Sequence, residues 1–125
     1  MSLTKYNGGI ANIIDKGELS LPFETDIYLQ TVIVAGLRYY IEENIILLEG
    51  EKIILKREPE NKYDEYAIEL YTEKNEKIGY VPKRNNKVFA RLMDAWKILY
   101  GEIRTINYYF KEIEEIWIKI FLKDI

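Results

Sequence analysis

Aromatic, cationic and acidic side chains stand close together at three places in this sequence: Arg38 with Tyr39, Tyr63 with Asp64, and Tyr80 with Lys83. Aromatic rings that stack on bases, combined with cations that contact phosphates, are the usual means of holding a single-stranded nucleic acid. A carboxylate repels phosphate, but Asp64 can accept a hydrogen bond from a sugar hydroxyl or a base amine. A free 3′-hydroxyl is such a donor. These residues are therefore candidates for a nucleic-acid site.

Positive charge is concentrated in residues 83–97, whose five cations face a single acidic residue, Asp94. Those cations are Lys83, Arg84, Lys87, Arg91 and Lys97. The whole chain has a net charge of −3 and an isoelectric point of about 5.2. Indiscriminate duplex binding usually needs a basic domain, so the sequence argues against it. Any nucleic-acid site must be a local basic patch, and Arg84 and Lys87 join the candidates.

Catalysis and metal binding are disfavoured by what the chain lacks. Histidine and cysteine are both absent, which removes the commonest general base, the thiolate metal sites and the usual nucleophilic triads. Asp64, Glu65 and Glu69 are close in sequence, but their spacing does not specify convergence on a cation. Asp64 is explained by the turn that it occupies. We expect a protein that is not an enzyme and holds neither a metal nor a cofactor.

Each candidate also has a purely structural interpretation. Tyr63 could pack its turn, Arg38 could pair with Glu58, and Tyr80 could belong to the core. The chain has eleven tyrosines, and tyrosine suits half-buried strand positions, so most of them need no functional role.

The run REPENKYDEYAIELYTEKNEKIGYVPK at 57–83, preceded by VAGLRYY at 34–40, resembles the HIRAN domain. That family occurs at the N-terminus of certain DNA translocases and as small stand-alone bacterial proteins. The resemblance covers roughly residues 27–105. Members characterised as DNA binders capture the 3′ end of single-stranded DNA. The resemblance therefore implies such a role here, connected with DNA repair or replication.

The resemblance also assigns roles by position. Arg38–Tyr39 matches the family's base-stacking and phosphate-contacting pair. Tyr63–Asp64 matches the 3′-end pair, with Asp64 on the hydroxyl. Lys83 matches a phosphate contact, and Tyr80 stands where some members have histidine.

No translocase motor follows the domain in this sequence, so we expect at most a sensor. It would act alone or with a separate helicase or translocase. The alternative function is a protein–protein interaction module that uses the barrel surface or a sheet edge.

Hydrophobic patterning predicts a mainly β protein, a small, partly open OB-like or SH3-like barrel of about six strands with two short helices. The strands are expected at 26–38, 51–57, 67–71, 77–82, 98–110 and 116–125. Gly36 interrupts the first strand, which suggests a bulge that turns Arg38 and Tyr39 outward. One short helix or turn is expected at 41–50, capped by Gly50.

The second helix is expected after Asn85. Its apolar face would consist of Val88, Phe89, Leu92, Met93 and Trp96. Residues 1–25 are expected to form an N-terminal arm packed on the domain, which would span 26–125. No apolar run reaches the length of a membrane span and no signal peptide is evident, so we expect a cytoplasmic protein.

Overall fold

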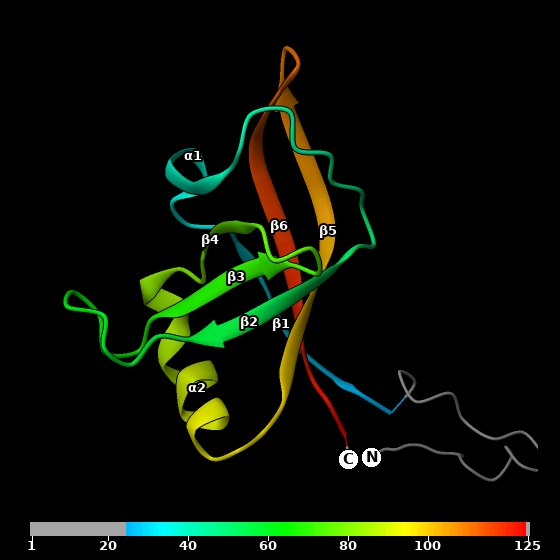
Figure 1. The fold of residues 1–125 in the computed structure, drawn as a ribbon. Helices are drawn as coiled ribbons and strands as arrows, with labels where there is room; N and C mark the ends of the chain where they lie inside the picture. Colours follow the sequence, from blue (N-terminus) through cyan, green and yellow to red (C-terminus); the bar gives the residue numbers. More distant parts are fainter. Residues whose placement is uncertain (1–24, 125) are drawn as a thin grey trace, which may run out of the picture.

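Six antiparallel strands curl into a half-barrel flanked by two helices in the computed structural model, which describes residues 25–124 (Figure 1). The elements are β1 (Ile27–Ile33), α1 (Leu37–Tyr40), β2 (Lys52–Arg57), β3 (Ile68–Thr72), β4 (Lys77–Tyr80), α2 (Lys83–Asp94), β5 (Leu99–Tyr109) and β6 (Glu112–Leu122). The strand order is β1-β6-β5-β2-β3-β4. The predicted mainly β fold, with about six strands and two short helices, is confirmed. The predicted N-terminal arm lies outside the described residues.

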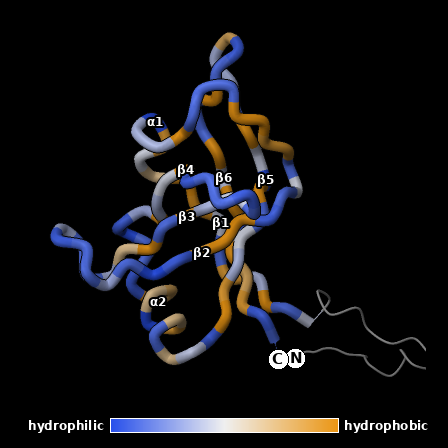
Figure 2. Tube along the Cα trace, viewed as in Figure 1, coloured by the Kyte–Doolittle hydropathy of each residue, from blue (hydrophilic) through white to orange (hydrophobic). Residues whose placement is uncertain are grey.

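The core lies on the inner face of the sheet. The alternation in β6 places Ile116, Ile118 and Ile120 in full burial, as a strand with one buried face requires. The strands carry both hydrophobic and hydrophilic residues, whereas the loop between β2 and β3 is hydrophilic (Figure 2). This loop and both helices project from the same side of the sheet in Figure 1. The fold therefore gathers its candidate site residues on one side.

The two edge strands meet where the chain leaves β1. Ala35 and Tyr80 exchange two backbone hydrogen bonds of 2.8 and 2.9 Å, which join the end of β1 to β4. Gly79 makes this approach possible, because a Cβ built there would lie 2.4 Å from the carbonyl oxygen of Ala35. The backbone contact between Ala35 and Tyr80 brings α1 next to β4.

The predicted strand at 26–38 is too long, and no bulge turns Arg38 and Tyr39 outward. β1 ends at Ile33, and Gly36 adopts a left-handed conformation with φ 75° at the start of α1. Glycine populates this conformation without steric cost, so the chain reverses here and then forms one helical turn. Arg38 and Tyr39 consequently lie on a helix.

The helix or turn predicted at 41–50 contains no helix. Asn44 has a positive φ, and Gly50 donates its N–H to the carbonyl of Ile103 at 2.7 Å, while Ile103 donates to Glu51. The end of this segment therefore pairs with β5 before β2 begins. Gly50 forms a turn and does not cap a helix.

The buried face of α2 also differs from the prediction. Asn86, Phe89 and Ala90 are buried, whereas Val88 is exposed. Trp96 lies beyond the end of the helix, also exposed and with φ 68°. Phe89, Leu92 and Met93 of the predicted face do pack on the core. The prediction wrongly included Val88 and Trp96, and it missed Asn86, a polar residue that the fold buries.

No helix in residues 25–124 is long and apolar enough to cross a bilayer. The same residues contain no group of three carboxylates placed to hold a metal ion.

Candidate nucleic-acid interface

The loop between β2 and β3 is shaped by the side chain of Asn61. Its Oδ1 accepts hydrogen bonds from the backbone N–H groups of Tyr63 and Asp64, at 2.8 and 3.0 Å. Its Nδ2 donates to Glu58 Oε1 at 2.9 Å. Asparagine stabilises turns in this way. The loop is thereby held in one shape that leaves the Tyr63 side chain 87% exposed.

Asp64 connects this loop to α2. Its Oδ1 accepts the N–H of Tyr66 at 2.9 Å, and its Oδ2 accepts from Asn86 Nδ2 at 2.7 Å. Asn86 is only 1% exposed. Each carboxylate oxygen has a second lone pair, so Asp64 keeps acceptor capacity after both bonds are made. A fixed, half-buried acceptor beside an exposed ring results.

The first two turns of α2 bring cations to the same place. Lys83 Nζ donates to the carbonyl of Tyr63 at 3.4 Å, and Lys87 Nζ lies 5.6 Å from the centre of the Tyr66 ring. Arg84 is exposed beside them. The structure thus brings Lys83 to Tyr63 and Lys87 to Tyr66 of the same loop. The sequence analysis had selected Tyr63, Lys83 and Lys87 separately.

Arg57 fixes the loop from its other side, a role that the sequence analysis missed. Its guanidinium donates to both oxygens of Asp94 in α2, at 2.9 and 3.1 Å, and to the carbonyls of Ala67 and Glu65, at 2.9 and 3.0 Å. The hydrogen bond from Arg57 lowers the pKa of Asp94. Both ends of α2 are therefore attached to the segment that carries Tyr63.

Tyr80 lies at the centre of a half-buried polar network. Its hydroxyl donates to Glu58 Oε1 at 2.6 Å and accepts from Lys77 Nζ at 3.0 Å. Lys77 also pairs with Glu69 at 3.0 Å. Burial, followed by the hydrogen bond to Glu58, raises the pKa of Tyr80 to about 12. Bonds from Tyr80 and then Asn61 lower the pKa of Glu58.

This network links α1 to the loop. The rings of Tyr40 and Tyr80 meet edge to face with centres 5.6 Å apart. In the part of the chain that the structure describes, the side chain of Glu58 bonds with Tyr80 and Asn61, so the alternative pairing of Arg38 with Glu58 does not form. A direct contact of Tyr80 with nucleic acid stays a prediction.

Arg38 and Tyr39 occupy the solvent side of α1. Leu37 is buried and Tyr40 packs on Tyr80, so the two residues between them point outward, and Tyr39 is 90% exposed. Tyr39 and Tyr63 therefore present exposed rings on two segments that share the Tyr80 network.

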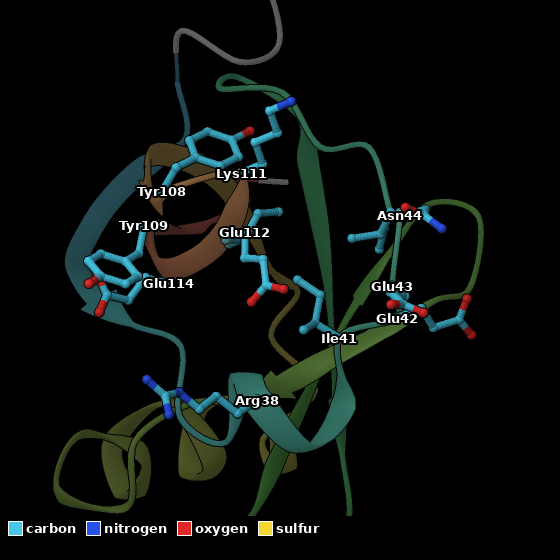
Figure 3. A pocket seen from close by; sticks show the side chains of 12 residues that line it. Arg38, Ile41, Glu42, Glu43, Asn44, Tyr108, Tyr109, Lys111, Glu112 and Glu114 are labelled. Atoms are coloured by element: carbon cyan, nitrogen blue, oxygen red, sulfur yellow. The ribbon is translucent and has the colours of Figure 1, made fainter.

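Arg38 also borders a pocket of about 720 Å³ that the sequence analysis did not foresee. Residues 41–45 form one wall and the end of the β5–β6 hairpin forms the other (Figure 3). Tyr108 and Tyr109 line the hairpin wall. Two adjacent tyrosines before a turn were the available signal, but the sequence alone did not place them opposite residues 41–45.

Comparison with known proteins gives a family and two long relatives. A family model described as HIRAN domain matches residues 27–120. A Fanconi-associated nuclease 1 homolog of Oryza sativa subsp. japonica is 37% identical over 81 residues, which cover 62% of this chain and 8% of that protein. The helicase-like transcription factor of Oryctolagus cuniculus is 36% identical over 61 residues, covering 49% and 6%. The chain therefore spans less than a tenth of the length of these curated relatives.

Solved structures share the fold. A protein from Lactobacillus plantarum superposes with a TM-score of 0.68 at 29% identity, covering 78% of this chain and 95% of that one. The crystal structure of the HIRAN domain of human HLTF gives a TM-score of 0.63 at 21% identity, covering 78% of each. The same HLTF domain, solved by NMR in its DNA-bound conformation, gives 0.54 at 21% identity, covering 81% and 82%.

Proposed function

This chain belongs to the HIRAN domain family, and from that membership and the geometry of its loop we propose that it is a non-catalytic module for single-stranded DNA. We propose further that it recognises the 3′-hydroxyl end. The observation that carries the proposal is the convergence of Tyr63, Asp64 and Lys83 through hydrogen bonds between the β2–β3 loop and α2. A ring, an acceptor and a cation meet there on rigid supports.

Each group has a definite task in this proposal. The exposed rings of Tyr39 and Tyr63 supply stacking surfaces, which suit any base because every base has an aromatic face. The cations Lys83, Arg84 and Lys87, with Arg38 on α1, contact phosphates. The remaining lone pairs of Asp64 accept the hydrogen bond of the terminal 3′-hydroxyl. Tyr80 positions α1 and the loop relative to each other.

The relatives support a setting for this activity. The HIRAN domain of human HLTF has been solved in a DNA-bound conformation, and the curated relatives carry the names of a nuclease and a helicase-like factor. We propose a role in DNA repair or replication, in which a separate helicase or translocase acts on the strand that this protein holds.

A titration with a labelled single-stranded oligonucleotide tests the binding site. Tyr39→Ala should weaken binding by about 1–3 kcal/mol, the usual value of one stacked base. Folding should be unaffected, because the side chain is almost fully exposed. Fluorescence anisotropy at low and moderate salt measures the affinity, and circular dichroism checks the fold.

Tyr28→Ala is the matched control, because it removes an exposed tyrosine ring from β1, where the ring packs on Phe121. It should leave DNA affinity unchanged. Equal losses for both variants, or no binding by the wild type at low salt, would rule out the proposed interface.

A further inference from the structure

The pocket between residues 41–45 and the β5–β6 hairpin is separate from the candidate site that Tyr63, Asp64 and Lys83 form beside α2. Tyr109 and Glu112 of the hairpin lie on one side of the opening and residues 41–44 lie on the other, with Arg38 below them in Figure 3. The hairpin end projects at the top of Figure 1, whereas α2 lies toward the bottom. Of the residues that line this pocket, the proposed DNA interface includes only Arg38.

The hairpin end exposes more apolar surface than its surroundings. The large exposed side chains here are Ile46, Leu48, Tyr108, Tyr109 and Phe110. Phe110 is 85% exposed and has φ 60°, a conformation that bulky residues rarely adopt. The rings of Tyr109 and Phe110 meet edge to face with centres 4.5 Å apart. Large apolar side chains that gather at an exposed place are typical of interaction sites.

Charge decides what kind of partner this surface fits. Residues 41–51 contain four glutamates and no cation, and residues 104–115 contain three glutamates against Arg104 and Lys111, so the two segments together carry a net charge of −5. Residues 83–97 at α2 carry +4. The hairpin end therefore repels the polyanion that the other end attracts, and it attracts a cationic partner.

The residues that line the pocket also have an excess of negative charge. Four carboxylates stand against two cations, Arg38 and Lys111, and the four are Glu42, Glu43, Glu112 and Glu114. None of the four carboxylates forms an ion pair or a side-chain hydrogen bond within residues 25–124. A cation placed between these carboxylates and the face of an exposed tyrosine ring is attracted by the negative charges and by the ring.

We propose that this pocket is a docking site for a lysine- or arginine-rich segment of a partner protein. The aromatic hairpin wall receives the alkyl and cationic parts of the basic side chains, and the glutamates neutralise them. A nucleic acid does not fit, because four of the six charged residues that line the pocket are glutamates. Two copies related by symmetry do not fit through this surface either, because each would present the same net negative charge. This inference does not depend on the proposed DNA end recognition.

Labelled octa-arginine and octa-lysine peptides serve as probes, with an octa-glutamate peptide as the negative reference. Binding is measured by fluorescence anisotropy near physiological ionic strength, where exposed charges beyond about 8 Å are largely screened. The double variant Glu112→Gln/Glu114→Gln should weaken binding of the basic peptides by about fivefold or more, and Tyr109→Ser should weaken it similarly.

The matched control is Glu60→Gln/Glu73→Gln, which removes the same charge from two exposed glutamates elsewhere. It should change the affinity less than about twofold, as expected for screened surface charges. Amide shifts on adding octa-arginine should be confined to residues 41–45 and 108–114. Equal losses for the two double variants, or shifts centred on α2, would show only general attraction to an acidic protein and overturn the proposal.

Two further measurements test whether the pocket binds a second copy of the chain or a nucleic acid in place of a basic protein segment. Sedimentation that shows a dimer broken by Glu112→Gln/Glu114→Gln would assign the surface to a second copy of the chain. Loss of single-stranded DNA affinity in that double variant, without loss of peptide affinity, would assign it to nucleic acid. Either result would overturn the proposal of a basic protein partner.

Discussion

Asp64 serves the fold and the proposed recognition with the same two oxygen atoms. One oxygen holds the turn through the N–H of Tyr66, and the other holds α2 through the amide of Asn86. Both bonds fix the carboxylate before any ligand arrives. A preorganised acceptor loses little entropy on binding, which is an advantage for recognising a single terminal hydroxyl.

Replacing Asn86 by alanine tests the structural half of this arrangement. The variant loses the 2.7 Å bond to Asp64 and leaves a half-buried carboxylate oxygen with one partner fewer. We expect the free energy of unfolding to fall by about 1–3 kcal/mol. Urea denaturation measures it. The adjacent Asn85→Ala is the matched control and should stay within about 0.5 kcal/mol. Equal changes in the two variants would contradict the structural role given to Asn86.

The sequence could single out Tyr63, Asp64 and Lys83 as candidates because turn chemistry and charge are local properties. Asn61 and Asp64 are turn formers wherever they occur, and the cations of α2 stand out against an acidic chain. Asn86 and Arg57 could not be identified in this way. Their partners lie 22 and 37 positions away, and only the folded loop shows that a buried amide and a guanidinium hold it.

At the level of elements, the position of α1 depends on how closely β1 and β4 approach. Two backbone hydrogen bonds join Ala35 to Tyr80, and Gly36 then turns the chain into α1. The exposed ring of Tyr39 lies on α1, and the exposed ring of Tyr63 lies on the β2–β3 loop. Both segments depend for their position on the contact between β1 and β4. Loss of this closure should disturb the interface as well as the barrel.

Gly79→Ala tests that closure. The new Cβ would meet the carbonyl oxygen of Ala35 at 2.4 Å and a methyl of Val34 at 2.6 Å, and the backbone cannot move without breaking the bonds to Tyr80. We expect a loss of unfolding free energy of about 3 kcal/mol or more, combining backbone strain with the clash. Thermal and urea denaturation measure the loss.

Gly50→Ala is the control for this substitution. Gly50 also has a positive φ, 91°, but a Cβ there meets nothing within 4 Å. Only the backbone strain of about 1 kcal/mol should remain. If both alanine variants lose the same stability, the close approach of β1 to β4 does not explain the need for Gly79.

The Tyr80 network makes a prediction about pH. Bonds from Tyr80 and Asn61 hold the pKa of Glu58 below its ordinary value of 4.5, so their stabilisation is fully present above that pH and is lost as the pH falls through the lowered pKa. Tyr80→Phe should cost about 1 kcal/mol at neutral pH. The difference from wild type should shrink near pH 3, as urea denaturation at the two pH values would show.

Tyr71→Phe controls for the loss of a tyrosine hydroxyl. Tyr71 donates to Glu69 at 3.2 Å, a longer bond that makes no direct contact with Glu58. Its effect on stability should vary less with pH. A difference between wild type and Tyr80→Phe that is equal at neutral and acidic pH would show that the charge of Glu58 does not matter to this network.

Helices and strands were predictable where hydrophobic residues recur at a regular spacing. They were less predictable where the conformation of a single glycine determines the path of the chain. The alternation from residue 116 onward predicted a strand correctly, because apolar residues recur there at every second position. The first strand was predicted to continue to residue 38, whereas β1 ends at Ile33 and residues 37–40 form α1. Gly36 is compatible with a bulge and with a left-handed helix start, and only the contact between Ala35 and Tyr80 selects the second.

For the molecule as a whole, charge separates two surfaces on an acidic chain. The cations of α2 lie beside the loop that carries Tyr63, while the glutamates lie around the hairpin pocket at the other end. A strand held at α2 is therefore directed away from the hairpin end by repulsion. The proposed basic partner and the proposed DNA strand can occupy the protein at the same time, with Arg38 between them.

The central claim is that Asp64 receives a 3′-hydroxyl, and one comparison tests it directly. Single strands that end in a 3′-hydroxyl or a 3′-phosphate are titrated against wild type and Asp64→Asn. The substitution weakens the hold on Tyr66 and Asn86, so the ratio of the two affinities within each protein is the quantity to compare.

For the wild type, the account predicts that a 3′-phosphate binds worse by about 1–3 kcal/mol, because an acceptor loses its donor and two negative charges meet. In Asp64→Asn the affinities for the 3′-hydroxyl strand and the 3′-phosphate strand should be closer to each other, because the negative charge at this position is gone. Blocking the 5′ end should change little. Equal affinity of the wild type for the two 3′ termini would contradict the claim.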